Sequence, residues 1–147
     1  MLRTIRSTQG VQTVEVTVKH LGEVQFEVTA RQHTVLCDQP AENGGKDEGM
    51  TPPEFFLASL ASCAAFYAVA YLKKKGLPRE GVEARVTAGK AAAPARLANF
   101  KIEVKIPTAL SEADRAGVDD AVHHCLIHNT LLYPPTIEIE LKTPEGA

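Results

Sequence analysis

The stretch from Phe55 to Leu72 contains no charged residue, and this limits the folds open to the chain. Pro52 and Pro53 come just before it and suit the first turn of a helix, while Gly76 follows it as a helix stop. A helix that is apolar on every side has to be covered on all faces. In a chain of 147 residues, a partner subunit is the expected cover.

The same stretch almost reaches the length of a membrane span. It is rich in alanine and includes Ser59 and Ser62, so its transfer into lipid would be weakly favourable. Amphipathic segments surround it, and no other stretch resembles it. We therefore expect a covered core helix and no membrane partner.

Alternating apolar and polar residues predict β-strands on both sides of this helix. An N-terminal hairpin is expected first, with a third strand as a candidate extension of it. Two strands follow the helix, and one more strand comes last. Glycine and proline predict loops between some of these strands. The strands are expected over 14–18, 24–28, 31–36, 82–87, 100–106 and 137–141, and the loops over 38–51 and 90–99.

A second helix is expected after Ser111, which is a good N-cap with Asp114 three residues on. Its apolar stripe includes Val118 and Cys125, and Asn129 could close it in a left-handed conformation. The order is β-β-(β)-α-β-β-α-β in a single domain over residues 1–147. This order indicates an α+β fold, with a sheet packed on the long apolar helix and a second copy of the chain beside it.

Charge and cysteine content exclude several classes of function. Sixteen basic and eighteen acidic residues give a net charge of −2, and there is no basic tract, so a nucleic-acid partner is not expected. Three cysteines do not form the even framework of a small secreted domain, and Met1–Arg6 lacks the apolar core of a signal peptide. A cytoplasmic location is therefore expected.

Two of the cysteines lie on the inward faces of the two predicted helices. Cys63 is deep in the apolar helix and Cys125 is on the stripe of the second helix, so the two thiols could meet in one core. Thiols that meet suggest redox chemistry, although a cysteine is often only a small buried apolar residue. Cys37, in a loop, is interpreted as incidental.

The sequence around these cysteines resembles the OsmC/Ohr family over nearly the whole chain. The resemblance rests on both cysteine contexts in the right order and on the loop before the helix. The matching segments are Asp38-Gln39-Pro40, Gly44-Gly45, Gly49-Met50-Thr51-Pro52-Pro53-Glu54 leading to Cys63, and Cys125 followed by Asn129-Thr130-Leu131. The Cys-Pro pair frequent in the family is replaced here by Cys125-Leu126.

The resemblance implies an intertwined homodimer in which sheets enclose the central helices. It also implies thiol-dependent reduction of organic hydroperoxides, with Cys63 as the attacking and Cys125 as the resolving thiol. A dithiol, either a dihydrolipoyl protein or a small thiol, would restore the pair. No cofactor and no metal are expected for this chemistry.

The attacking thiolate needs a cation, because apolar surroundings raise a thiol pKa and the helix dipole fades within a turn. In the Ohr branch an arginine held by a helix glutamate fills this role. Glu54, nine residues before Cys63, matches the glutamate in kind, and Arg31 is the best candidate for the cation. Alternatively, Glu54 is a first-turn acid and Arg31 a solvated charge.

Two other classes of function compete with the peroxidase. His124 and His128 are spaced as zinc ligands on a helix, close to His123 and Cys125, although Cys125 lies on another face. A histidine could instead tune the thiol. The third hypothesis is a non-catalytic dimer that binds a small apolar ligand, and the lack of an arginine in the first hairpin turn favours it.

Overall fold

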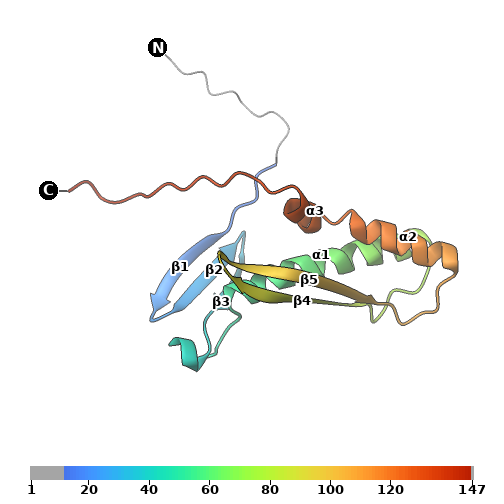
Figure 1. Cartoon of the computed structure of the whole chain (residues 1–147), viewed down its shortest axis with the longest axis horizontal. Helices are drawn as coiled ribbons and strands as arrows, with labels where there is room; N and C mark the ends of the chain where they lie inside the picture. The colour runs from blue at the N-terminus through green and yellow to red at the C-terminus, as the bar shows by residue number, and fades with distance from the viewer. Residues whose placement is uncertain (1–11, 147) are drawn as a thin grey trace, which may run out of the picture. The chain divides into compact units, whose positions relative to one another are not determined.

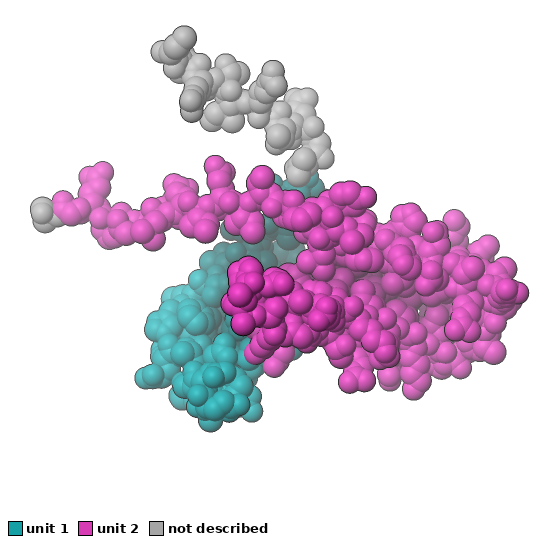
Figure 2. All heavy atoms as spheres, viewed as in Figure 1, with its two compact units in different colours: residues 1–52 teal, residues 53–147 magenta. Residues whose placement is uncertain are grey.

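The computed structural model describes residues 12–146, so Met1–Arg6 lie outside the described residues. The chain divides into two compact units, Met1–Pro52 and Pro53–Ala147 (Figure 2). Strands dominate the first unit, and the second combines helices with a hairpin (Figure 1). The predicted α+β class is therefore confirmed. The prediction of a single domain over residues 1–147 stays a prediction.

The first unit is built on a three-stranded antiparallel sheet in the order β1-β2-β3. β1 spans Thr17–Gly22 and β2 spans Gln25–Ala30, which confirms the predicted hairpin. The prediction that β1 starts at Val14 is wrong, because Val14 and Val16 precede the strand and are exposed. Thr17 pairs with Thr29, so Ala30 is the only residue of β2 left beyond this pair, and Val14 has no β2 residue opposite it.

The predicted third strand is present but begins later than expected. β3 spans His33–Cys37, and Arg31 lies in the turn before it with a φ of 55°. Assigning Arg31 to a strand was therefore wrong. A left-handed residue at this position turns the chain sharply enough for Ala30 and His33 to pair.

The loop from 38 to 51 is organised by the fully buried side chain of Asp38. Its carboxylate accepts hydrogen bonds from Gln25 Nε2 at 3.0 Å and from the backbone N–H groups of Gln39 at 2.8 Å, Lys46 at 3.2 Å and Glu48 at 3.1 Å. The loop also contains a short 3₁₀ helix, η1, at Ala41–Asn43. Four donors on one carboxylate fold the loop back on itself.

Close backbone approaches explain two of the glycines in this loop. A Cβ on Gly45 would overlap the carbonyl of Gln39, and one on Gly49 would overlap the carbonyl of Leu36. Only glycine lets these backbone segments lie so close together. The glycines that suggested an irregular loop therefore make it compact.

The long helix α1 spans Pro52–Lys74, as predicted. Glu54 lies in its first turn, and Lys73 and Lys74 lie in its last, so both ends complement the helix dipole. Gly76 is left-handed at φ 66°, and the N–H of Leu77 donates to the carbonyl of Leu72 at 2.9 Å. This is the glycine-terminated ending that the sequence predicted.

The length and composition of α1 would also allow it to cross a membrane, as the sequence suggested. Its fully buried residues instead form a single stripe at every fourth position: Leu60, Ala64, Ala68 and Leu72. Ala68 and Leu72 pack with Val118 in the core of the second unit. One side of α1 is therefore covered by other elements of the same chain.

A two-stranded hairpin accompanies α1 in the second unit (Figure 1). β4 spans Glu83–Ala92 and β5 spans Ala95–Lys105. The predicted loop over 90–99 is therefore wrong, because both strands continue to a tight turn at Ala93–Pro94. Alanines dominate residues 90–99 and hide the alternation of apolar and polar side chains that would indicate a strand. Their backbones still pair, as Ala92 does with Ala95.

The second predicted helix is divided into two. α2 spans Glu112–His123 with Ser111 as its N-cap, and the Ser111 side chain accepts from Asp114 N at 3.1 Å, as predicted. α3 spans Leu126–Leu132 with Cys125 as its N-cap, so the expected closure at Asn129 is wrong. The N–H groups of His124 and Cys125 bond three residues back, which tightens and ends α2.

Histidine side chains at the end of α2 favour this break. The Nδ1 groups of His123 and His124 donate to the carbonyls of Asp119 and Asp120 at 2.7 and 2.8 Å. The carbonyl of Asp120 is the one that the N–H of His124 would use to continue the helix. Competition for this carbonyl helps α2 to stop where it does.

Tyr71 joins α2 to α1. Its hydroxyl donates to Asp114 at 3.0 Å, and a Cβ on Gly117 would clash with the tyrosine ring. The glycine therefore lets α2 lie directly against the ring. This contact holds the two helices in one packing arrangement.

The predicted last strand over 137–141 is wrong for the described chain. The segment after α3 is neither helix nor strand, and Ile137, Ile139 and Leu141 are 83%, 92% and 87% exposed. A strand exists only by pairing with another strand. The alternation is present, but no strand of the described chain pairs with it.

We expect Asp38 to make the stability of the protein sensitive to acid. Its hydrogen bonds, chiefly that from Gln25, lower the carboxyl pKa to about 2, so stability present above pH about 4 is lost as pH falls through about 2. Asp38→Asn should lower stability at pH 7 and flatten this loss. Urea unfolding of both proteins between pH 2 and pH 7 measures it.

Asp47→Asn, in the same loop but exposed, serves as the control and should unfold like the native chain. An Asp38→Asn protein as stable as this control at pH 7 would contradict the structural role of the carboxylate.

Candidate functional site

The structure brings Cys63 and Cys125 together. Cys63 lies midway along α1, is partly buried, and neighbours the fully buried Ala64. Cys125 lies at the start of α3 and is fully buried. The two side chains are close enough to interact directly, and both are free thiols. Sixty-one residues of chain lie between two thiols that share one site.

Burial raises the pKa of the Cys125 thiol, and a hydrogen bond to Cys63 adds to the rise. The backbone amides of His128 and Ile127, in the first turn of α3, act in the opposite direction. Burial is the largest of these effects, so Cys125 is a neutral thiol at pH 7. It can donate its S–H toward the sulfur of Cys63.

The third cysteine has a different environment. Cys37 ends β3 in the first unit and is buried. Burial and the neighbouring charge of Asp38 both raise the pKa of its thiol. The predicted loop position of Cys37 is therefore wrong, and its surroundings do not favour a reactive thiolate.

The two residues predicted to assist the thiols lie in different units. Glu54 is in the first turn of α1, two to three turns from Cys63 along the same helix. Arg31 is exposed in the turn between β2 and β3, in the first unit. The structure therefore confirms the helix position of Glu54, and the role of Arg31 stays a prediction.

The histidines around Cys125 separate into two kinds. His123 and His124 are exposed at the end of α2, where they hold Asp119 and Asp120. His128 lies on the other side of the helix break, in the first turn of α3, so it does not share one helical face with His124. No three or more metal-binding side chains gather within residues 12–146, and the zinc hypothesis has no ligand set there.

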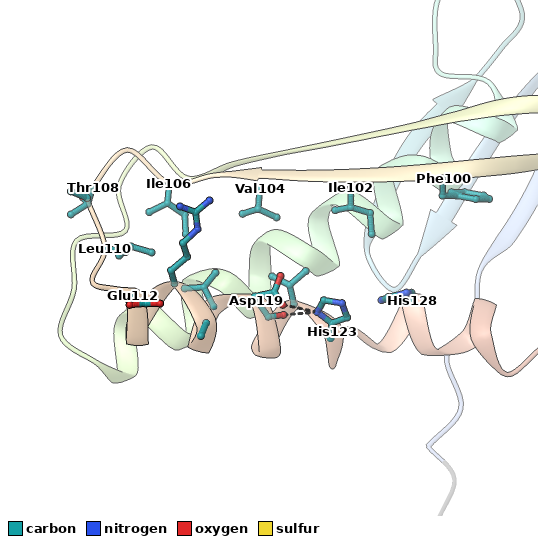
Figure 3. A pocket seen from close by; sticks show the side chains of 15 residues that line it. Phe100, Ile102, Val104, Ile106, Thr108, Leu110, Glu112, Asp119, His123 and His128 are labelled. Atoms are coloured by element: carbon teal, nitrogen blue, oxygen red, sulfur yellow. Dashed lines mark hydrogen bonds and ion pairs between the residues drawn. The ribbon is translucent and has the colours of Figure 1, made fainter.

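A cavity of about 960 Å³ lies between β5 and the α2–α3 segment. Figure 3 shows Phe100, Ile102 and Val104 of β5, and Ile106 just after the strand, on the side of the hairpin that faces α2. The opposite wall has polar groups, among them the Asp119–His123 pair and His128 (Figure 3). The cavity therefore has one apolar wall and one wall whose side chains can donate and accept hydrogen bonds.

Sequence reasoning missed the individual roles of Asp38 and His128. Asp38 could have been noticed because an aspartate followed by a glycine-rich loop often bonds to nearby backbone N–H groups. His128 could not, because its position depends on the break between α2 and α3. A continuous helix would have placed it at the helix end.

We expect the three thiols to differ in reactivity. Cys63 should be alkylated first, because Cys37 and Cys125 are buried and have raised pKa values. A raised thiol pKa means less thiolate at neutral pH, and burial limits access, so Cys125 should react more slowly in the folded than in the urea-unfolded protein. Timed iodoacetamide labelling with peptide mass spectrometry measures all three sites. Faster labelling of Cys125 than of Cys63 in the folded protein would contradict the assigned burial.

Solved structures share this fold. An osmotic stress induced and detoxification response protein from Psychrobacter arcticus 273-4 is 23% identical, with a TM-score of 0.72 over 83% of this chain and 89% of that chain. The OsmC like protein from Mycoplasma pneumoniae is 20% identical, with a TM-score of 0.71 over 82% and 88%. An organic hydroperoxide resistance protein, OsmC, from Legionella pneumophila is 21% identical, with a TM-score of 0.58 over 84% and 91%.

These likenesses confirm the predicted OsmC-like fold. No curated protein matches the sequence significantly. The sequence matches the family described as OsmC-like protein over residues 45–140, which include both cysteines of the site. The chain belongs to the OsmC-like protein family.

Proposed function

We propose that this protein is a thiol-dependent peroxidase that reduces organic hydroperoxides through Cys63 and Cys125. The contact between a partly buried thiol on α1 and a fully buried thiol at the start of α3 carries the proposal. Fold relatives from Legionella pneumophila, Elizabethkingia anophelis and Bacillus subtilis are described as organic hydroperoxide resistance proteins. They support the same class of reaction for this chain.

The first step oxidises Cys63. Its thiolate attacks the hydroperoxide, so an S–O bond forms, the O–O bond breaks, and the organic oxygen takes up a proton and leaves as an alcohol. The sulfur becomes a sulfenic acid, losing two electrons to the peroxide. The second step joins the thiols: Cys125 attacks the Cys63 sulfur, the S–O bond breaks, and hydroxide leaves as water with the proton of Cys125.

Burial favours this division of roles between the two thiols. A hydroperoxide with an organic group needs access to the attacking sulfur, and Cys63 is the less buried thiol. Cys125 is enclosed and neutral, so it is protected from the peroxide until the sulfenic acid forms beside it. An accessible thiol next to a resolving thiol is typical of redox-active cysteines.

The remaining components of the cycle are proposed from the family resemblance. Glu54 and a cation, for which Arg31 is the candidate, would favour the thiolate of Cys63. A dihydrolipoyl protein or a small dithiol would reduce the disulfide and return both thiols. The reducing cytoplasm is the compartment in which such a cycle can turn over.

One equivalent of tert-butyl hydroperoxide should convert the reduced protein to a Cys63–Cys125 disulfide. Cys63→Ser should slow peroxide consumption by roughly a hundredfold or more, since it removes the nucleophile. Cys125→Ser should stop at the sulfenic acid of Cys63. Rapid quenching, dimedone trapping and peptide mass spectrometry measure these products.

Cys37→Ser is the matched control and should behave like the native protein. If Cys63 and Cys125 stay reduced in the folded native protein, the peroxidase proposal fails. The alternative would then lead, a non-catalytic OsmC-like protein that binds a small apolar ligand, because the cavity beside β5 offers the volume for one.

We also propose that the functional form is a homodimer. Large apolar side chains are exposed on α1 and near both ends of the chain, including Phe66 at 66% and Ile139 at 92%. Val14 and Val16 alternate with polar residues before β1, as Ile137 and Ile139 do after α3. Apolar segments of this kind are typical of surfaces that pair with another chain.

Sedimentation equilibrium should therefore give twice the chain mass of 15.9 kDa. Ile137→Glu combined with Ile139→Glu should shift the protein toward the monomer, because charges would replace the apolar alternation. A native protein that stays monomeric at concentrations near 100 μM, where even weak dimers form, would exclude the homodimer.

A further inference from the structure

His128 carries an unusual atom. Its Nδ1 is buried and has no hydrogen-bond partner, and within residues 12–146 it is the one buried side-chain nitrogen or oxygen in this condition. Buried polar groups in folded proteins are almost always paired, because leaving one unpaired costs stability. An unpaired buried nitrogen therefore suggests a role in a step of the reaction in which it does find a partner.

The position of His128 connects this atom to the resolving thiol. Cys125 is the N-cap of α3 and His128 is the third residue of its first turn. The backbone amide of His128 acts on the Cys125 sulfur. Its side chain lines the cavity beneath Phe100, as labelled in Figure 3. His128 therefore lies between a fully buried thiol and a cavity.

The other charged and titratable groups around this cavity are engaged or distant. On α2, His123 is held by Asp119 through its Nδ1, while Glu112 lies toward the other end of the cavity (Figure 3). Arg115 on α2 is the cation of the lining, and an arginine cannot take up a proton. The wall from β5 is apolar. On α1, Cys63 contacts Cys125 and Tyr71 donates to Asp114.

The resolving step needs a base. A neutral thiol attacks poorly, so Cys125 has to give up its proton as it approaches the oxidised sulfur of Cys63. Burial shields Cys125 from bulk water, which could otherwise accept the proton. The buried histidine nitrogen without a partner among the described residues is Nδ1 of His128, three residues after Cys125.

We propose that His128 exchanges the proton of Cys125 during disulfide formation, an inference that rests on the proposed peroxidase cycle. Nδ1 takes the proton as the Cys125 sulfur attacks, the S–S bond forms, and the S–O bond of the sulfenic acid breaks. The leaving hydroxide then receives the proton from the imidazolium and departs as water. Protons and electrons balance, and His128 returns to its neutral form.

The test separates the two steps of the cycle in the full-length protein. His128→Asn places an amide where Nδ1 lies but cannot exchange a proton. With one equivalent of tert-butyl hydroperoxide at pH 7, Cys63 sulfenic acid should form at the native rate. Disulfide formation should slow by about 10²-fold, the usual contribution of a positioned acid or base.

The pH profile distinguishes proton exchange from a structural effect. In the native protein, disulfide formation should accelerate between pH 5 and 8, where histidine loses its charge and becomes a base. In His128→Asn this rise should vanish, and the rate should recover only at alkaline pH, where Cys125 ionises by itself. His33→Asn, an exposed histidine of β3 in the first unit, is the control and should keep the native profile.

Circular dichroism and the melting temperature check folding, and His128→Gln replaces His128→Asn if the latter is unfolded. Equal disulfide rates and equal pH profiles in native and variant proteins would overturn the role of His128 while leaving the peroxidase intact. A native protein that forms no Cys63 sulfenic acid would overturn the peroxidase itself.

Discussion

Burial of one stripe of α1 is the constraint on which the second unit depends. Leu60, Ala64, Ala68 and Leu72 recur at every fourth residue, and the alanines let neighbouring elements approach the helix closely. The polar contact of Tyr71 with Asp114 then fixes α2 beside this helix. Because Cys63 is next to Ala64, the same packing carries its thiol to the point where Cys125 lies.

Local patterns in the sequence predicted the elements whose stability is local. The N-terminal hairpin, both ends of α1 and the Ser111 cap follow from alternation, proline, glycine and capping, all of which act within a few residues. The alanine-rich part of the β4–β5 hairpin was missed, since alanine hardly distinguishes an inward from an outward position. Both cysteines were identified as site candidates from their places on apolar faces.

The features that sequence reasoning missed depend on interactions across the chain. The strand expected over 137–141 needs a neighbouring strand to pair with, and no strand of the described chain pairs with it. The break before Cys125 comes with N–H groups that bond three residues back and with a His124 side chain that bonds to the carbonyl of Asp120. Asp38 collects donors from β2 and from two parts of its loop, and no short pattern contains all of them.

The break between α2 and α3 also sets how the chain can vary in length. Each residue of an α-helix turns the next by about 100°, so one residue added or removed between Val122 and Cys125 would rotate the start of α3 away from α1. Both α2 and α3 could still form after such a change, but the thiols of Cys63 and Cys125 would no longer be in contact. The tight turn at Ala93–Pro94 joins two exposed strand ends, and added residues there would only lengthen a loop. Evolution can therefore lengthen the hairpin freely, while the junction ahead of Cys125 has to keep its residue count.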